Sequence, residues 1–321
     1  MNVSRRTAMK MAGSSIAVAA SGAGRALSAT STIRFSYQRS STLLTLLKAN
    51  GVLETRLGAK GFGVSWHLFD DVISAMNAGA VDFHADVADA VPIFTQSAGA
   101  PLTFYAKEDA SPSAEAIIVR ADSPIKTIGD LKGKTVAVHR GSGCHFILAG
   151  ALKRAGLSFK DITPAYLPPA DAAIAFERGN VDAWAIWDPF LAITEAKFAT
   201  RTLADATGLS SYDRYYTVGN AFVAAHSELV GIVFNALAET GTWVKQNPRE
   251  AAGRLVPLWG GIPLSVIETV NNRRSYAVKP VAREALGEQQ AIADTFYGAG
   301  LIPKPIDATD VKIWRPRESP T

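Results

Sequence analysis

Strand patterns and helix patterns alternate along most of this chain. A short strand-like run at residues 32–38 precedes leucines at helical spacing in 42–57, where Gly51 predicts a break, and the same order continues to about residue 122. A second series begins near residue 134 and ends with a strand pattern over residues 215–228, after which the sequence is mainly helical. Such alternation predicts an α/β fold, in which helices cover both faces of sheets rich in parallel strands. The absence of a low-complexity linker between the two series predicts two lobes joined directly by strands.

The first 29 residues have the composition of an export signal. They combine a basic start, a weakly apolar middle and small residues near Ala29. The pair Arg5-Arg6 resembles a twin-arginine signal, although Ala8 stands where an aromatic residue or leucine is usual. An ordinary secretory signal is the alternative, and both predict a mature protein that is exported.

Charge and cysteine content exclude several classes of protein. The whole chain has a net charge of +4, and residues 1–29 supply four basic side chains and no acid, so the remainder is close to neutral (+4 − 4 = 0). With no run of Lys or Arg, we expect no nucleic-acid partner. The single cysteine, Cys144, permits no internal disulfide and lies far from any lipid-attachment position, which predicts a soluble protein without a lipid anchor.

Two similar loops are candidates for anion binding. In the first, Arg39, Ser40 and Ser41 follow a strand and precede a helix; in the second, Arg140 precedes Gly141, Ser142 and Gly143. The first N–H groups of a helix have no partner within the helix, and the helix dipole favours negative charge there. In open α/β sheets, ligands bind where the strands end at their carboxyl side. The alternative is that these serines are ordinary helix caps.

A search for catalytic and metal-binding patterns favours neither. Nucleophile-elbow, phosphate-loop and zinc-protease motifs are absent from the sequence. Cys144 and His145 are adjacent on a predicted helix, where neighbouring side chains point about 100° apart. Asp82, His84 and Asp86 alternate and would share one face of a strand, as either metal ligands or solvated acids. We therefore predict no enzyme activity, no catalytic residue, no metal and no cofactor.

The stretch GNVDAWAIWDPF, residues 179–190, reads as a strand that leads into a helix. Alternation places Trp184 and Trp187 on opposite faces. Trp184, in mid-strand, fits a core position. Trp187 and Asp188 come at the carboxyl end, where Trp187 would line a cleft and Asp188 would be either a ligand acceptor or a helix cap. Pro189 is typical of a helix start.

The chain closely resembles the aliphatic-sulfonate-binding proteins of ABC importers, within the wider nitrate, sulfonate and taurine group. The resemblance is carried by SPIKTIGDLKGKTVAVHRGSGCHFILAGALKRAGL, by YLPPADAAIAFERGNVDAWAIWDPF and by the terminal VKPV…IADTFYGAGLIPK. It extends from about Thr32 to Pro316.

This resemblance implies a two-lobe periplasmic binding protein of type II, each lobe a doubly wound mixed sheet with flanking helices and the ligand cleft between them. Lobe one would comprise residues 30–119 and 222–321, and lobe two residues 120–221. Closure around an organosulfonate would present the periplasmic protein, a monomer, to an ABC permease in the inner membrane.

The resemblance also implies a set of ligand-binding residues. Arg273 would pair with the sulfonate, and an aromatic residue near the second crossing would line the cleft. The whole set is Tyr37, Gln38, Arg39, Ser40, Ser41, Asp86, Asp89, Gly141, Ser142, Gly143, Cys144, His145, Trp187, Asp188, Asn220, Phe222 and Arg273.

One segment departs from the family pattern. A small loop rich in hydroxyl residues usually follows Asp82-Phe83, whereas this chain has HADVADAVP, with an added carboxylate at Asp86. A carboxylate beside a sulfonate would be repulsive and costly to bury. Asp86 could point away, the ligand could carry an amine, or the ligand could be nitrate, a sulfate ester or a thiamine-precursor pyrimidine. An enzyme on the same scaffold is a more distant alternative.

Overall fold

The computed structural model describes residues 31–38, 40–69 and 72–316. By its internal contacts the chain divides into residues 1–30 and 31–321. The expected export signal and Arg39 lie outside the described residues.

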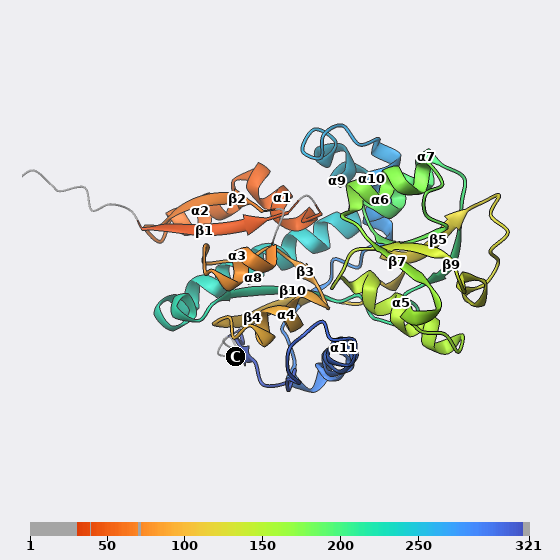
Figure 1. The fold of residues 1–321 in the computed structure, drawn as a ribbon. Coiled ribbons are helices and arrows are strands. Elements are labelled where there is room, and N and C mark those ends of the chain that lie inside the picture. Colours follow the sequence, from red (N-terminus) through yellow and green to blue (C-terminus); the bar gives the residue numbers. More distant parts are fainter. Residues whose placement is uncertain (1–30, 39, 70–71, 317–321) are drawn as a thin grey trace, which may run out of the picture. The chain divides into compact units, whose positions relative to one another are not determined.

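One sheet is built around two long antiparallel strands, β4 (Leu102–Glu108) and β10 (Arg214–Gly219). The short strands β3 (Val87–Ala88), β11 (Val278–Lys279) and β12 (Lys312–Ile313) pair with them. Strand β1 (Thr32–Tyr37) runs parallel to β2 (Gly63–Leu68), and Phe83 bridges β1 to β10. The strand order from the outer edge inward is therefore β2, β1, the segment around Phe83, β10 and β4 (Figure 1).

The helices associated with this sheet come from both ends of the chain. They are α1 (Thr42–Asn50), α2 (Val52–Gly58), α3 (Val72–Asn77), α4 (Val91–Ser97), α8 (Asn220–Gln246), α9 (Pro248–Leu255), α10 (Leu264–Arg273) and α11 (Gly287–Gly298). Leucines of α1 and valines of α8 pack on Phe35 and Phe83 in one apolar core. The break between α1 and α2 falls at Gly51, as expected, because its left-handed backbone (φ 63°) ends the first helix.

The second sheet has the order β7-β6-β8-β5-β9. Its strands are β5 (Glu115–Arg120), β6 (Thr135–Val138), β7 (Thr163–Tyr166), β8 (Ala183–Trp187) and β9 (Thr200–Asp205). Helices α5 (Gly143–Arg154), α6 (Pro169–Glu177) and α7 (Phe190–Lys197) connect or follow these strands. β6, β7 and β8 run parallel, and β5 and β9 are antiparallel to their neighbours, so the sheet is mixed.

The chain changes sheet at two places. β4 belongs to the first sheet and β5 to the second, so the first crossing is residues 109–114; β9 and β10 place the return crossing at 206–213. The lobe boundaries expected from the sequence are residues 120 and 222. Because β5 and β10 each pair along their whole length within one sheet, both changes fall earlier in the chain.

The start of α8 corrects a second expectation. Residues 215–228 read as a strand, but β10 ends at Gly219 and α8 begins at Asn220. α8 is also long and apolar enough to cross a membrane by length and composition. In this structure Leu229, Val233 and Leu237 are buried in the core beneath the first sheet instead.

Candidate ligand-binding site

The carboxyl ends of the parallel strands carry the residues that the sequence singled out. β1 leads into α1 through Gln38 and Ser41, and β6 leads into α5 through Ser142. β8 ends at Trp187. Each sheet therefore offers one helix N-terminus at the edge where ligands bind in open α/β sheets.

Side-chain contacts hold Tyr37, Gln38 and Ser41 in place. The Gln38 amide donates to the Asp86 carbonyl at 2.6 Å, and the Lys48 ammonium donates to the Tyr37 hydroxyl at 2.7 Å. Ser40 and Ser41 are buried. Ser41 Oγ accepts from the Gln38 N–H at 3.2 Å and makes no cap bond to α1, so the simple capping interpretation does not hold at this helix.

Asp86 faces the protein interior. Its Oδ2 accepts from Arg214 Nε at 2.6 Å, and its carbonyl accepts from Arg214 Nη2 at 2.9 Å; both side chains are buried. Arg274 lies 3.9 Å from the same oxygen and also pairs with Glu108. The positive charges of two arginines thus balance the negative charges of two carboxylates. Asp86, the added acid of the HADVAD segment, is therefore not an unpaired charge that a ligand anion would meet.

The start of α5 is capped and tightly packed. Ser142 Oγ accepts from the His145 N–H at 3.3 Å and donates to the His139 carbonyl at 2.7 Å. The His145 ring accepts from the Gly141 N–H at 3.1 Å. Gly141 has φ 77°, and a Cβ there would lie 2.8 Å from the Phe94 ring. Only glycine therefore fits at the position before Ser142.

Two buried carboxyl groups that sequence reasoning did not bring together lie against the first turn of α5. A Cβ added to Gly143 would lie 2.8 Å from Glu115 Oε2 and 3.2 Å from Asp89 Oδ1. The Cys144 thiol donates to Glu115 Oε2 at 3.3 Å, and the Ser210 hydroxyl donates to Asp89 Oδ2 at 2.6 Å. Asp89 follows β3 and Glu115 opens β5, so only the folded chain joins them.

Burial dominates the protonation of this cluster. It raises the pKa of Asp89 to about 7, against the opposing hydrogen bond from Ser210, and raises the pKa of Glu115 well above its usual range. It also raises the pKa of the Cys144 thiol, with the neighbouring Glu115 adding to the effect. Cys144 is thus held as a thiol, and its side chain is directed to Glu115, whereas the His145 ring bonds the Gly141 N–H. This geometry does not form a thiolate–imidazole pair.

We expect the raised pKa of Asp89 to appear in the stability of the protein. A carboxyl whose folded pKa lies above its unfolded value of 3.8 stabilises the fold below that value, and loses this contribution as the pH rises through about 7. The free energy of unfolding, measured by urea titration, should therefore decline between pH 4 and pH 8, and Asp89→Asn should flatten the decline. The exposed Asp122→Asn is the control. An equal decline in both variants would contradict the assignment.

Trp187 and Asp188 lie where the sequence placed them, at the end of β8. Trp187 is half-buried, 6.0 Å from the His139 ring, whereas Trp184 is buried beside Phe176 of α6. Asp188 is buried and its Oδ1 accepts from the Ala192 N–H at 3.0 Å in the first turn of α7, although Pro189 holds the cap position of this helix. Its Oδ2 has no hydrogen-bond partner among the described residues.

Arg273 is paired within the protein. It donates to Asp188 Oδ1 at 3.3 Å and to Glu195 at 2.6 Å, and so ties the end of α10 to the start of α7. Burial raises the pKa of Asp188 to about 6, although Arg273 opposes the shift. The bidentate sulfonate contact expected for Arg273 would require it to leave one of these partners.

Asn220 and Phe222 lie away from the strand ends that carry the other candidate residues. They follow β10 at the end that pairs with Leu102, whereas Arg214 begins the strand near Asp86. Asn220 accepts from the Thr103 hydroxyl at 2.7 Å, and the Phe222 ring packs 5.0 Å from Phe83. The structure does not bring these two residues to the ends of β1, β6 and β8, because the return crossing precedes β10 instead of following it.

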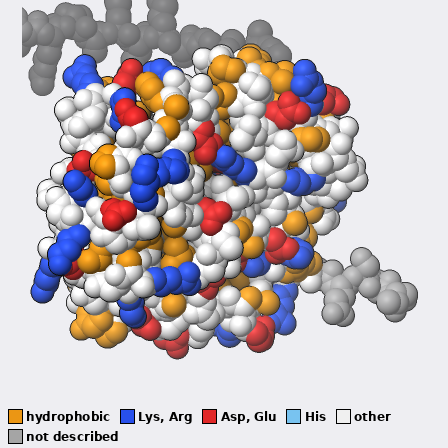
Figure 2. Space-filling model, turned by 90° about the vertical axis from the view of Figure 1, so that its right-hand side faces the viewer, with side chains coloured by type: hydrophobic (Ala, Val, Ile, Leu, Met, Phe, Trp, Pro, Cys, Tyr) orange, Lys and Arg blue, Asp and Glu red, His pale blue; other side chains and the backbone are white. Residues whose placement is uncertain are grey.

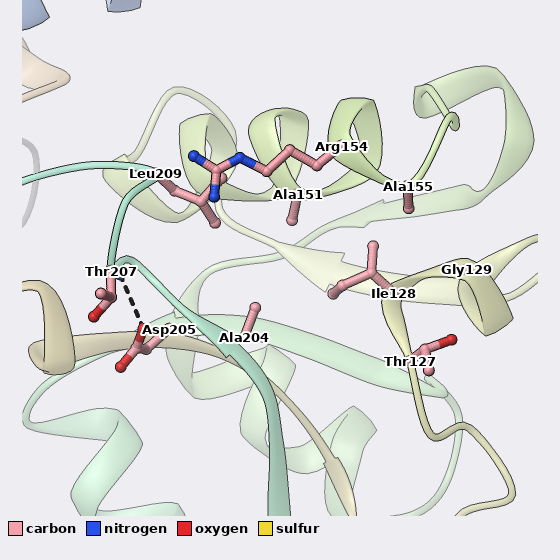
Figure 3. Close-up of a pocket in the computed structure, with 10 residues that line it drawn as sticks. All are labelled: Thr127, Ile128, Gly129, Ala151, Arg154, Ala155, Ala204, Asp205, Thr207 and Leu209. Atoms are coloured by element: carbon pink, nitrogen blue, oxygen red, sulfur yellow. Dashed lines mark hydrogen bonds between the residues drawn. The ribbon is translucent and has the colours of Figure 1, made fainter.

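Two other features are separate from this site. A pocket of about 610 Å³, lined by Thr127, Arg154 and Leu209 among others, lies along the last turns of α5 and not at its start (Figure 3). Asp82 pairs with Arg34 near the surface, and Asp86 pairs with Arg214. The two acids therefore do not converge on His84, and no metal-binding cluster is found in the described part of the chain.

Two mixed sheets with flanking helices, joined by two crossings and with helix N-termini at the strand ends, define a two-lobe periplasmic binding protein of type II. The chain matches the NMT1/THI5-like family model over residues 69–251. A relative from Escherichia coli (strain K12), named as an aliphatic sulfonates-binding protein, is 37% identical over 95% of this chain and 93% of the relative.

Solved structures agree with this assignment. The periplasmic aliphatic sulphonate binding protein SsuA from Escherichia coli has a TM-score of 0.82 and 36% identity, covering 90% of this chain and 94% of that chain. The alkanesulfonate-binding protein SsuA from Xanthomonas axonopodis pv. citri, bound to MOPS, has a TM-score of 0.78 and 33% identity, covering 85% and 95%. The chain therefore belongs to the family of the aliphatic sulfonate-binding proteins. This confirms the resemblance, the fold class and the prediction of a binding protein, not an enzyme.

Proposed function

We propose that this protein captures an organosulfonate in the periplasm, between its two lobes, and delivers it to an ABC permease. One observation carries the proposal. The starts of α1 and α5, which favour anions, lie at strand ends, and the nearby Asp86 carboxylate is neutralised by Arg214. The sulfonate oxygens would accept hydrogen bonds from the N–H groups at the starts of α1 and α5. With Asp86 paired to Arg214, the added carboxylate of the departing HADVAD segment is compensated within the protein.

The lobes in this proposal follow the strand pairing. Lobe one comprises residues 31–108 and 214–316, lobe two comprises 115–205, and the two crossings act as the hinge. The residues that we propose to surround the head group are Gln38, Ser40, Ser41, Ser142, Gly143, Trp187 and Asp188. We also propose Arg39, whose support comes from its position in the sequence between Gln38 and Ser40. Arg273 would act by holding Asp188 in place.

We keep the expectation of a soluble monomer without a lipid anchor that does not bind nucleic acid. Lys and Arg side chains are intermixed with Asp and Glu over the face at the right of Figure 1, as Figure 2 shows. This face therefore has no single-sign field of the kind that nucleic-acid binding needs.

The direct test is a thermal-shift titration of the protein without residues 1–29. The panel would contain alkanesulfonates, taurine, a zwitterionic sulfonate buffer, nitrate, sulfate and an aminopyrimidine. A ligand at 100 times its Kd adds about 2.7 kcal/mol of stability, enough to move the melt clearly. We expect sulfonates to shift the melt, and nitrate and the pyrimidine to leave it unchanged. A shift by the pyrimidine alone would overturn the ligand class and leave the fold unaffected.

Tryptophan fluorescence separates the two indoles of β8. Because Trp187 is half-buried at the strand end and Trp184 is buried beneath α6, Trp187→Phe should remove most of the sulfonate-induced fluorescence change. Trp184→Phe should leave the change in place. If the signal persists in Trp187→Phe and disappears in Trp184→Phe, Trp187 does not contact the ligand.

A further inference from the structure

Two carboxyl groups from different lobes meet at the first turn of α5. Asp89 follows β3 in lobe one, and Glu115 is the first residue of β5 in lobe two. A Cβ placed on Gly143 would lie 3.2 Å from Asp89 Oδ1 and 2.8 Å from Glu115 Oε2, so both carboxyls lie against the backbone of this turn. Both side chains are buried. The helix start that we propose for the sulfonate head therefore has two acids directly beside it.

These two acids have uncharged partners. Asp89 Oδ2 accepts from the Ser210 hydroxyl at 2.6 Å, and Glu115 Oε2 accepts from the Cys144 thiol at 3.3 Å. Among the residues that the structure describes, the buried Glu115 Oε1 has no hydrogen-bond partner, and neither acid forms an ion pair of the kind that holds Asp86. Because an unpaired charge is costly to bury, the protonated and neutral form of both acids is favoured here.

The surrounding groups separate the two acids by the pH at which they ionise. The titratable and charged groups that face the pair come from α5, from α11 and from the return crossing with the start of β10: Cys144, Glu288, Tyr212, Asp213 and Arg214. Burial raises the pKa of Asp89 to about 7, and Glu288 and Asp213 add to the shift. Burial raises the pKa of Glu115 well above its usual range, and Asp89 adds to the shift whereas Arg214 opposes it. Asp89 therefore changes charge near neutral pH, while Glu115 stays neutral.

We propose that Asp89 couples sulfonate capture to the uptake of a proton. Its neutral carboxyl permits an anion at the start of α5, and its ionised carboxylate repels that anion. This inference rests on the proposed function, because it places the sulfonate at the first N–H groups of α5. A helix start carries a partial positive charge of roughly half a unit, which a full negative charge beside it would outweigh. Bound sulfonate would in turn hold the proton on Asp89, since coupling between two binding sites is reciprocal.

The test is isothermal titration calorimetry of the protein without residues 1–29, with butanesulfonate and octanesulfonate, between pH 6.5 and pH 8.5. Bis-Tris and Tris are the buffers, because sulfonate buffers would compete as ligands. The affinity of the unmodified protein should fall by about tenfold over this range as Asp89 ionises. Asp89→Asn keeps a hydrogen-bond acceptor but cannot ionise, so its affinity should stay constant. At pH 7.5 the difference in binding enthalpy between the two buffers should show proton uptake by the unmodified protein and none by Asp89→Asn.

Two variants serve as controls. Glu115→Gln should keep the fall in affinity, because Glu115 stays protonated over this range. The exposed Asp122→Asn should behave as the unmodified protein does. Asp188 is present in every variant, and burial raises its pKa only to about 6, so most of its change in charge occurs at lower pH. The difference between Asp89→Asn and the unmodified protein therefore reports on Asp89.

The outcomes separate the two proposals. Sulfonate affinity that does not change with pH in the unmodified protein would overturn the coupling while the sulfonate function stands. An equal fall in Asp89→Asn and in the unmodified protein would also overturn it, even if Asp89→Asn bound more weakly at every pH, since that result would indicate a packing role. Failure of the unmodified protein to bind either sulfonate at any pH would overturn the proposed function itself, and the coupling with it.

Discussion

Gly241→Ala is expected to lower the free energy of unfolding by about 3 kcal/mol or more, at the upper end of overpacking substitutions. Gly241 lies in α8, where the helix crosses the backbone at Tyr276. A Cβ at this position would overlap the Tyr276 carbonyl oxygen, far inside van der Waals contact. Because the obstacle is backbone, no side-chain rotation relieves it, and α8 must move away from the core that it shares with Leu43 and Phe83.

The same helix supplies the control for this prediction. Gly231 also lies in α8, and a Cβ there would meet the Trp314 ring at 3.7 Å, an ordinary contact. Gly231→Ala should be neutral or stabilising by up to about 1 kcal/mol, since alanine favours helix more than glycine does. Urea unfolding followed by circular dichroism measures both. Equal stabilities of the two variants would show that α8 is not held against Tyr276.

Arg214→Met is expected to cost about 3–5 kcal/mol, because it leaves the buried Asp86 carboxylate without its main partner. The loss includes both the charge pair at 2.6 Å and the hydrogen bond to the Asp86 carbonyl. Arg274, at 3.9 Å, is also committed to Glu108 and offers only partial compensation. The double variant Arg214→Met/Asp86→Asn should recover much of the lost stability, since it removes the unpaired charge.

An exposed pair provides the comparison. Arg34 and Asp82 form a salt bridge at 2.8 Å near the surface, and Arg34→Met should cost no more than about 1 kcal/mol. If Arg214→Met were equally mild, Asp86 would not depend on Arg214, and a carboxylate free to turn toward the ligand would again be a reasonable interpretation. That result would favour a ligand carrying an amine.

Local sequence patterns predicted the helices and strands of the fold more completely than they predicted the contacts of the site. Leucine spacing and the glycine at position 51 predicted α1 and its end, and alternation in residues 181–188 predicted β8 with its two tryptophans on opposite faces. The start of α8 was misassigned because residues 215–223 keep aromatic and β-branched residues up to Val223, across the boundary at Gly219. In the structure β10 ends there and the alanine-rich stretch that follows is helical.

The site depended on contacts that local patterns do not encode. Asp86 and Arg214 are 128 residues apart, and their pairing follows only from the return of β10 beside β3. The same holds for Asp89 and Glu115, which meet only after the chain has changed sheet. The helix starts were predictable because each is a short strand–loop–helix unit, while the partners of their charged neighbours were not.

The position of the two crossings also determines how a ligand can act on the protein. Rotation about an axis through residues 109–114 and 206–213 displaces each strand in proportion to its distance from that axis. β4 and β5 would hardly move, whereas the tips of β2 and β7 would describe the longest arcs. A contact of a given strength between the lobes at those tips would therefore resist reopening with more torque than the same contact made close to the axis.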